Sequence, residues 1–144
     1  MDRLETLAPE LVQRLRQASP AKQRAAAIAA SDFALEKGHL QHAVVDEARE
    51  TLRTAGGMSA AQQAELEALM SKLDNEYFDL QEAAEEGRAT IEDYTRKFAQ
   101  ARAVSALLFA SKGDPLEAST EAVYEAAAAF DDKRPLFLVV ESVL

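Results

Sequence analysis

Hydrophobic side chains recur every three or four residues along most of this chain, a period that predicts helices rather than strands. Residues that start helices, such as Ser59, Thr90 and Asp114, precede several of these segments, and glycines follow them. The pattern predicts an all-α fold, a single compact bundle or orthogonal array of six to seven helices. We expect residues 1–144 to form one domain, because this length can bury a core without disulfides.

The longest predicted helix covers about residues 60–86. Ser59 and Gln62 have the spacing of a capping box, and Gly87 suits the left-handed position that ends a helix. At 1.5 Å per residue, this helix is on the order of 40 Å long. One side of it carries the apolar residues Leu66, Leu69, Met70, Leu73, Tyr77, Leu80 and Ala84.

Further helices are predicted over about residues 9–18, 20–37, 40–54, 91–112 and from 115 onward. The segment 103–110 is apolar almost all round, so the helix 91–112 is expected at the centre of the bundle. In the next helix, Glu117, Glu121 and Glu125 are expected on the outer side. Residues 135–144 suit a strand as well as a helix, but no second strand is predicted, and we read them as helix.

Phe78 points away from the apolar side of the long helix, and carboxylates surround it. Asp74, Glu82 and Glu85 lie four residues before it and four and seven residues after it, on its own side of the helix. An apolar anchor ringed by charge is typical of an interface hot spot. The sequence therefore predicts a partner-binding site formed by Asp74, Phe78, Glu82 and Glu85. The alternative, that a neighbouring helix simply covers Phe78, stays open.

The net charge of −9 comes from one part of the chain. Residues 1–57 hold eight basic and eight acidic side chains, whereas residues 58–144 hold eight basic and 17 acidic ones. An acidic surface repels nucleic acid and anionic membranes, so a basic protein partner is expected instead. The charge also has a simpler explanation, since it keeps a protein soluble.

His39, His42 and Asp46 are the only metal-site candidate. Glu36 and His39 have the Glu-x-x-His spacing of di-iron bundles, but that chemistry needs the motif on two helices, and here it occurs once. We expect these side chains to form a solvated polar face on the helix 40–54, with Asp46 able to pair with Arg49. The sequence therefore predicts no metal ion.

Catalytic motifs are absent from the sequence. The chain has no cysteine, no serine in a Gly-x-Ser-x-Gly elbow and no glycine-rich phosphate loop. We predict no enzyme, no catalytic residues and no cofactor. The first residues are charged, unlike a signal peptide, and no apolar run approaches the roughly 20 residues that span a membrane, so a cytoplasmic location is expected.

Arg102 falls on or beside the buried side of the helix 91–112. We expect it to extend to the rim of the core, and the alternative is a buried ion pair with a carboxylate of the long helix or of the helix beginning at Asp114. Four basic residues near the N-terminus offer weak support for nucleic-acid binding, and pairing with carboxylates of the acidic half explains them equally well. These residues are Arg14, Arg16, Lys22 and Arg24.

The function predicted from these observations is a small, acidic, cytoplasmic protein-interaction module that occludes a basic partner. A small, acidic, helical protein without cysteine resembles the bacterial immunity proteins that block nuclease toxins. This resemblance is one of general type and no motif carries it. A regulatory or scaffold subunit, homodimeric through the long helix, is the alternative. A metal-binding or enzymatic helical bundle comes third.

Overall fold

The computed structural model describes residues 3–144 and shows an all-α protein without β-strands in that range. One helix more is present than the six or seven expected. The helices are α1 (Arg3–Leu7), α2 (Pro9–Gln17), α3 (Pro20–Lys37), α4 (Ala43–Ala55), α5 (Ala60–Glu85), α6 (Ile91–Ala110), α7 (Pro115–Ala128) and α8 (Arg134–Ser142).

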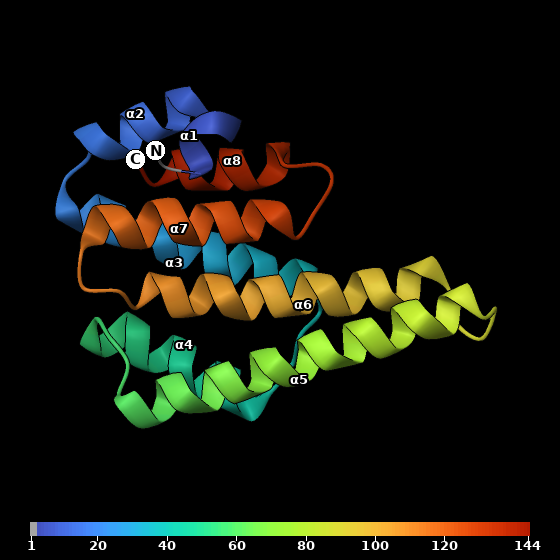
Figure 1. The fold of residues 1–144 in the computed structure, drawn as a ribbon. Helices are drawn as coiled ribbons and strands as arrows, with labels where there is room; N and C mark the ends of the chain where they lie inside the picture. The colour runs from blue at the N-terminus through green and yellow to red at the C-terminus, as the bar shows by residue number, and fades with distance from the viewer. Residues whose placement is uncertain (1–2) are drawn as a thin grey trace.

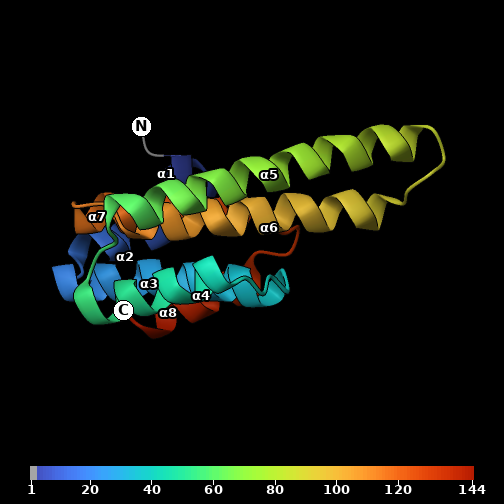
Figure 2. The same cartoon turned by 90° about the horizontal axis from the view of Figure 1, so that it is seen from below.

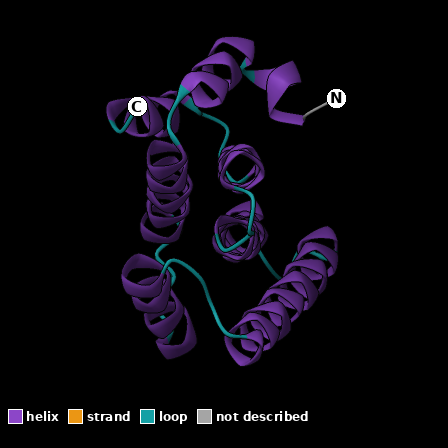
Figure 3. Ribbon diagram, turned by 90° about the vertical axis from the view of Figure 1, so that its left-hand side faces the viewer, coloured by secondary structure: helices purple, strands orange, loops and turns teal. Residues whose placement is uncertain are grey.

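The helices form two layers (Figure 1). Seen along the helix axes, α8, α3 and α4 make one layer, α7, α6 and α5 make the other, and α1 and α2 lie across one end (Figure 3). Helices α3, α6 and α7 pack against one another at the centre. Their contact surfaces are rich in buried alanine, which lets helix axes approach closely: Ala26, Ala30, Ala34, Ala103, Ala106, Ala110, Ala118, Ala122 and Ala126.

Side-chain caps set most of the helix starts where the sequence predicts them. The Ser59 hydroxyl accepts a hydrogen bond from the Gln62 backbone N–H at 3.1 Å, and the Gln62 side chain accepts one from the Ser59 N–H at 3.1 Å. Thr90 and Asp93 form the same reciprocal box, and Asp114 caps α7. Each cap satisfies backbone donors that the first helical turn leaves free.

Helices α1 and α4 differ from those predicted, and the structure settles whether the C-terminal segment is a helix or a strand. Helix α1 was not predicted, since five residues with Leu4 alone buried give no readable period. Helix α4 begins at Ala43 rather than Leu40, because the chain turns sharply at His39, whose φ of 55° is left-handed. The C-terminal segment is helical, as read from the sequence, and Leu136 and Val140 of α8 are buried.

Candidate functional site

Residues 74–98 of the α5–α6 hairpin form a projection whose tip extends beyond the rest of the molecule (Figures 1 and 2) and whose base lies beside the α3–α4 turn, where Glu76, Lys97 and His39 line one pocket. We call this part the arm. The arm projects because α5 and α6 are 26 and 20 residues long, whereas the neighbouring α7 ends after 14 residues at Ala128. The two helices of the arm pack mainly against each other there.

Four aromatic rings form what we call the arm aromatic cluster: Tyr77, Phe78, Tyr94 and Phe98. The contacts of Tyr77 with Tyr94 and Phe98 join α5 to α6, whereas Phe78 contacts Tyr77 of its own helix. Tyr77 is the centre of the cluster, with ring centroids 5.1 Å from Phe78, 5.9 Å from Tyr94 and 5.5 Å from Phe98. Such distances are those of favourable tilted or edge-to-face contacts. The sequence had placed Tyr77 on the apolar side and Phe78 opposite, so their direct contact was not expected.

Phe78 is 60% exposed, the most exposed aromatic side chain of the described residues. The alternative in which a neighbouring helix covers Phe78 is therefore wrong. The rest of the cluster is half-buried, so the ring of Phe78 extends an aromatic surface outward from the arm. An exposed aromatic ring supported by others has the form of an anchor for a partner.

Carboxylates dominate the surface of the arm. Residues 74–98 carry eight acidic side chains and three basic ones, Arg88, Arg96 and Lys97, so more than half of the net charge of −9 lies here. Glu82 and Glu85, two of the predicted binding residues, are exposed, and no ion pair engages either one within residues 3–144. Their charges face solvent next to Phe78 along the helix.

Asp74 differs from the other predicted site residues, because it is engaged inside the protein. Its carboxylate lies 3.5 Å from the Arg102 guanidinium of α6. Arg102 also donates a hydrogen bond to Glu125 of α7 at 3.2 Å. The Arg102 side chain is 23% exposed, so it reaches the rim as expected, and there it also forms the ion pairs of the alternative, with both proposed helices at once.

Glu125 departs from the expectation, since it is 5% exposed and does not lie on the outer side of α7. Arg3 of α1 lies 3.3 Å from it, pairs with Glu121, and places its guanidinium carbon 4.2 Å from the centre of the Tyr124 ring. The hydrogen bond to Glu121 raises the pKa of Arg3 above its ordinary value. A chain of charges therefore links α1 and α7 to the base of the arm.

The two histidines lie in the turn before α4, not on a helical face. His39 and His42 are exposed, and the Nδ1 atom of His42 accepts a hydrogen bond from the Val44 N–H at 3.2 Å, so His42 caps α4. Arg49 pairs with Asp32 at 2.8 Å and with Glu36 rather than with Asp46. Within residues 3–144, no group of three or more potential metal-ligating side chains converges.

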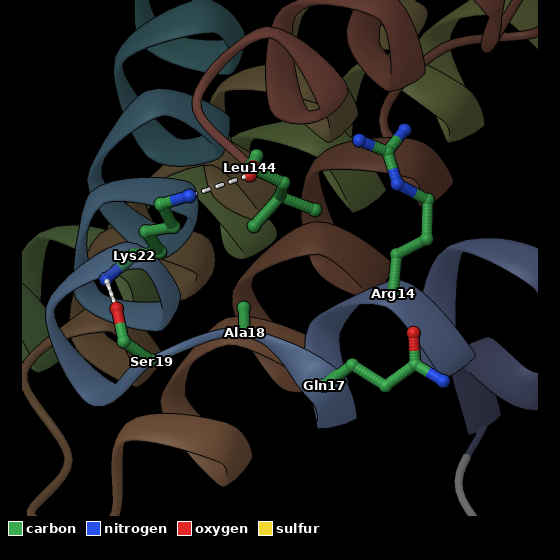
Figure 4. A pocket seen from close by; sticks show the side chains of 6 residues that line it. All are labelled: Arg14, Gln17, Ala18, Ser19, Lys22 and Leu144. Atoms are coloured by element: carbon green, nitrogen blue, oxygen red, sulfur yellow. Dashed lines mark hydrogen bonds between the residues drawn. The ribbon is translucent and has the colours of Figure 1, made fainter.

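The basic residues near the N-terminus bind other parts of the chain. Arg14 and Lys22 line a shallow pocket between α2, α3 and the C-terminal residue, where Lys22 donates to the Leu144 carbonyl at 3.0 Å (Figure 4). Arg14 lies 3.8 Å from Glu141, Arg16 pairs with Glu5, and Arg24 donates to carbonyls at the end of α6. All four thus make intramolecular contacts, but among the described residues only Arg14 pairs with a carboxylate of the acidic half, residues 58–144, as the sequence had suggested for the group.

No protein-family model, curated protein or solved structure matches this chain. Within residues 3–144, none of the helices has the length and apolar character required to cross a bilayer. Functional inference therefore depends on the chemistry of the surface, and the arm is where exposed apolar area and unpaired charge coincide.

Proposed function

We propose that the protein is an interaction module whose arm binds and occludes a basic protein partner in the cytoplasm. Phe78, exposed on a projecting acidic hairpin, is the observation that carries this proposal. An immunity-type protein that blocks the basic surface of a nuclease is one form such a module takes. The proposal assigns the chain no catalytic role, cofactor or metal.

Two physical properties of the arm support a protein partner. The aromatic cluster presents apolar area whose burial would stabilise a complex, and the arm's own packing already holds the Phe78 backbone in a helix. Glu82 and Glu85 with the rest of the acidic surface would raise the association rate of a cationic partner. The anchor Phe78 and the charges that attract the partner, Glu82 and Glu85, then lie on one helix, α5.

A homodimer through the long helix is the alternative function, as a regulatory or scaffold subunit. The charge of the arm weighs against it, because two copies joined there would bring together two surfaces that each carry an excess of carboxylates. A dimer that forms only at high ionic strength would be the signature of that alternative, since salt screens such repulsion.

Capture of partners from a lysate of the source organism tests the proposal. Wild-type protein should retain a basic protein that Phe78→Ala loses, because the substitution removes the anchor. Leu138→Ala is the matched control: Leu138 is 66% exposed on α8, away from the arm. This control should capture the same partner as the wild type.

Salt dependence separates the two roles assigned to the site. Replacing Glu82 and Glu85 by Gln should slow association and flatten its dependence on salt while dissociation changes little. Phe78→Ala should mainly speed dissociation. Equal capture by wild type and Phe78→Ala, with matching melting temperatures, would refute the arm as the binding surface.

A further inference from the structure

We infer that the arm recognises an arginine side chain of its partner, whose guanidinium stacks on the Phe78 ring and pairs with Glu82 and Glu85. This inference rests on the proposed function and makes the partner's chemistry specific. It concerns the kind of cation the site prefers, not merely the sign of its charge.

Of the nine aromatic rings of residues 3–144, five have a cation of the chain over them, and Tyr77, Phe78, Tyr94 and Phe137 have none. A Lys or Arg side chain lies within 6.0 Å of the centre of five rings, those of Phe33, Phe98, Phe109, Tyr124 and Phe130. The ring face is electron-rich and attracts positive charge. Phe78 is more exposed than any of these five rings, yet no cation of residues 3–144 lies over it.

Two of the five contacts involve arginine, and in both the guanidinium also pairs with carboxylates beside the ring. The Arg3 guanidinium lies over Tyr124 and pairs with Glu121 and Glu125. The Arg102 guanidinium carbon lies 6.0 Å from the Phe98 centroid, and its nitrogens contact Glu125 and Asp74. The fold thus uses the combination of a ring, carboxylates and a guanidinium twice.

The surface at Phe78 has two of these three components. Glu82 and Glu85 lie one and two turns along α5 on the same side as Phe78 and are exposed. Asp74 is already paired with Arg102, so it is left out of the proposed contact. A guanidinium of the partner would complete the same combination of ring, carboxylates and guanidinium a third time, next to the one around Arg102.

Arginine suits this surface better than lysine. Its planar guanidinium stacks flat on a ring while its N–H groups still reach carboxylates at the edge, and it is more weakly hydrated than an ammonium ion. Lysine is a compact, strongly hydrated charge, so it would feel the acidic surface without gaining as much from the ring.

Binding of two basic peptides of equal length and charge tests the inference. One peptide has arginine and the other lysine at every basic position, and titration calorimetry gives both affinities. We expect the wild type to bind the arginine peptide about fivefold more tightly. Phe78→Leu, which keeps an apolar side chain without a ring, should bind both peptides equally, whereas Leu138→Ala should keep the preference.

Each other outcome has a distinct meaning. Equal binding of the two peptides by the wild type, or a preference that survives in Phe78→Leu, would overturn the arginine inference and leave the basic-partner proposal standing. If neither peptide binds, both fail. If sedimentation shows a wild-type dimer that Phe78→Leu dissociates, a second copy of the chain covers the ring, and the inference is wrong.

Discussion

The arm and the body of this molecule share two helices, α5 and α6, yet different contacts stabilise each region. In the half of α6 within the body, Ala103, Val104, Ala106 and Leu107 are fully buried, and α3, α5 and α7 surround them. In the half within the arm, Ile91 is 68% exposed and the main support is the aromatic contact with α5. Buried aliphatic packing fixes the body, whereas the arm retains apolar surface that a partner can use.

The largest contrast should appear when one apolar side chain is removed from each region. Leu107→Ala should lower the free energy of unfolding by about 2–5 kcal/mol, because a fully buried leucine leaves a cavity. Phe78→Ala in the arm should change it by no more than about 0.5 kcal/mol. Chemical denaturation measures both. A loss of several kcal/mol in Phe78→Ala would mean that the ring belongs to the core.

The junction between the two regions should show an intermediate effect. Arg102→Met leaves Glu125, 5% exposed, with Arg3 as its remaining cation, so we expect a loss of about 1–3 kcal/mol. In a double-mutant cycle with Glu125→Gln, the double variant should lose less free energy of unfolding than the two single variants added together. The reason is that the double variant leaves neither Arg102 nor Glu125 without its partner charge. Strict additivity would show that the two side chains do not interact.

Local signals explain how much of the fold could be predicted from the sequence. Ser59, Thr90 and Asp114 act on backbone groups within three residues, so their caps were predictable without tertiary structure. The exposed acidic side of α5 was likewise predictable from helical periodicity. The all-α class follows from the same two signals.

Long-range contacts explain what could not be predicted. Arg102 finds partners 28 residues before it and 23 after it in the sequence, at Asp74 and Glu125, and helical periodicity carries no information about which helices meet. Phe78 is exposed because α5 packs chiefly against α6 and α4, so no further helix covers its side of α5. Both facts are properties of packing, and the candidate site depends on both.

The cap at the arm tip should produce a smaller, more local effect. Thr90 caps α6 by accepting from the Asp93 N–H at 3.2 Å, so Thr90→Ala should cost about 1 kcal/mol. Amide hydrogen exchange should accelerate mainly within residues 84–98 of the arm, while buried amides of the body change less. Uniform acceleration over both regions would show that the arm does not open independently.

The smallest expected effect is the pH dependence of that same cap. The Thr90 N–H donates to the Asp93 carboxylate at 2.9 Å, and this hydrogen bond lowers the pKa of Asp93. Because the folded pKa lies below the unfolded one of about 3.9, the stabilisation is complete above the unfolded value and disappears as pH falls through the folded value.

Asp93→Asn removes this titration, and Glu5 and Asp132, whose pKa values are also lowered, are common to both proteins. The stability difference between wild type and Asp93→Asn should therefore be constant near neutral pH and shrink in acid. A difference that stays unchanged as the pH falls through and well below the unfolded pKa would show that the Asp93 charge does not stabilise the arm.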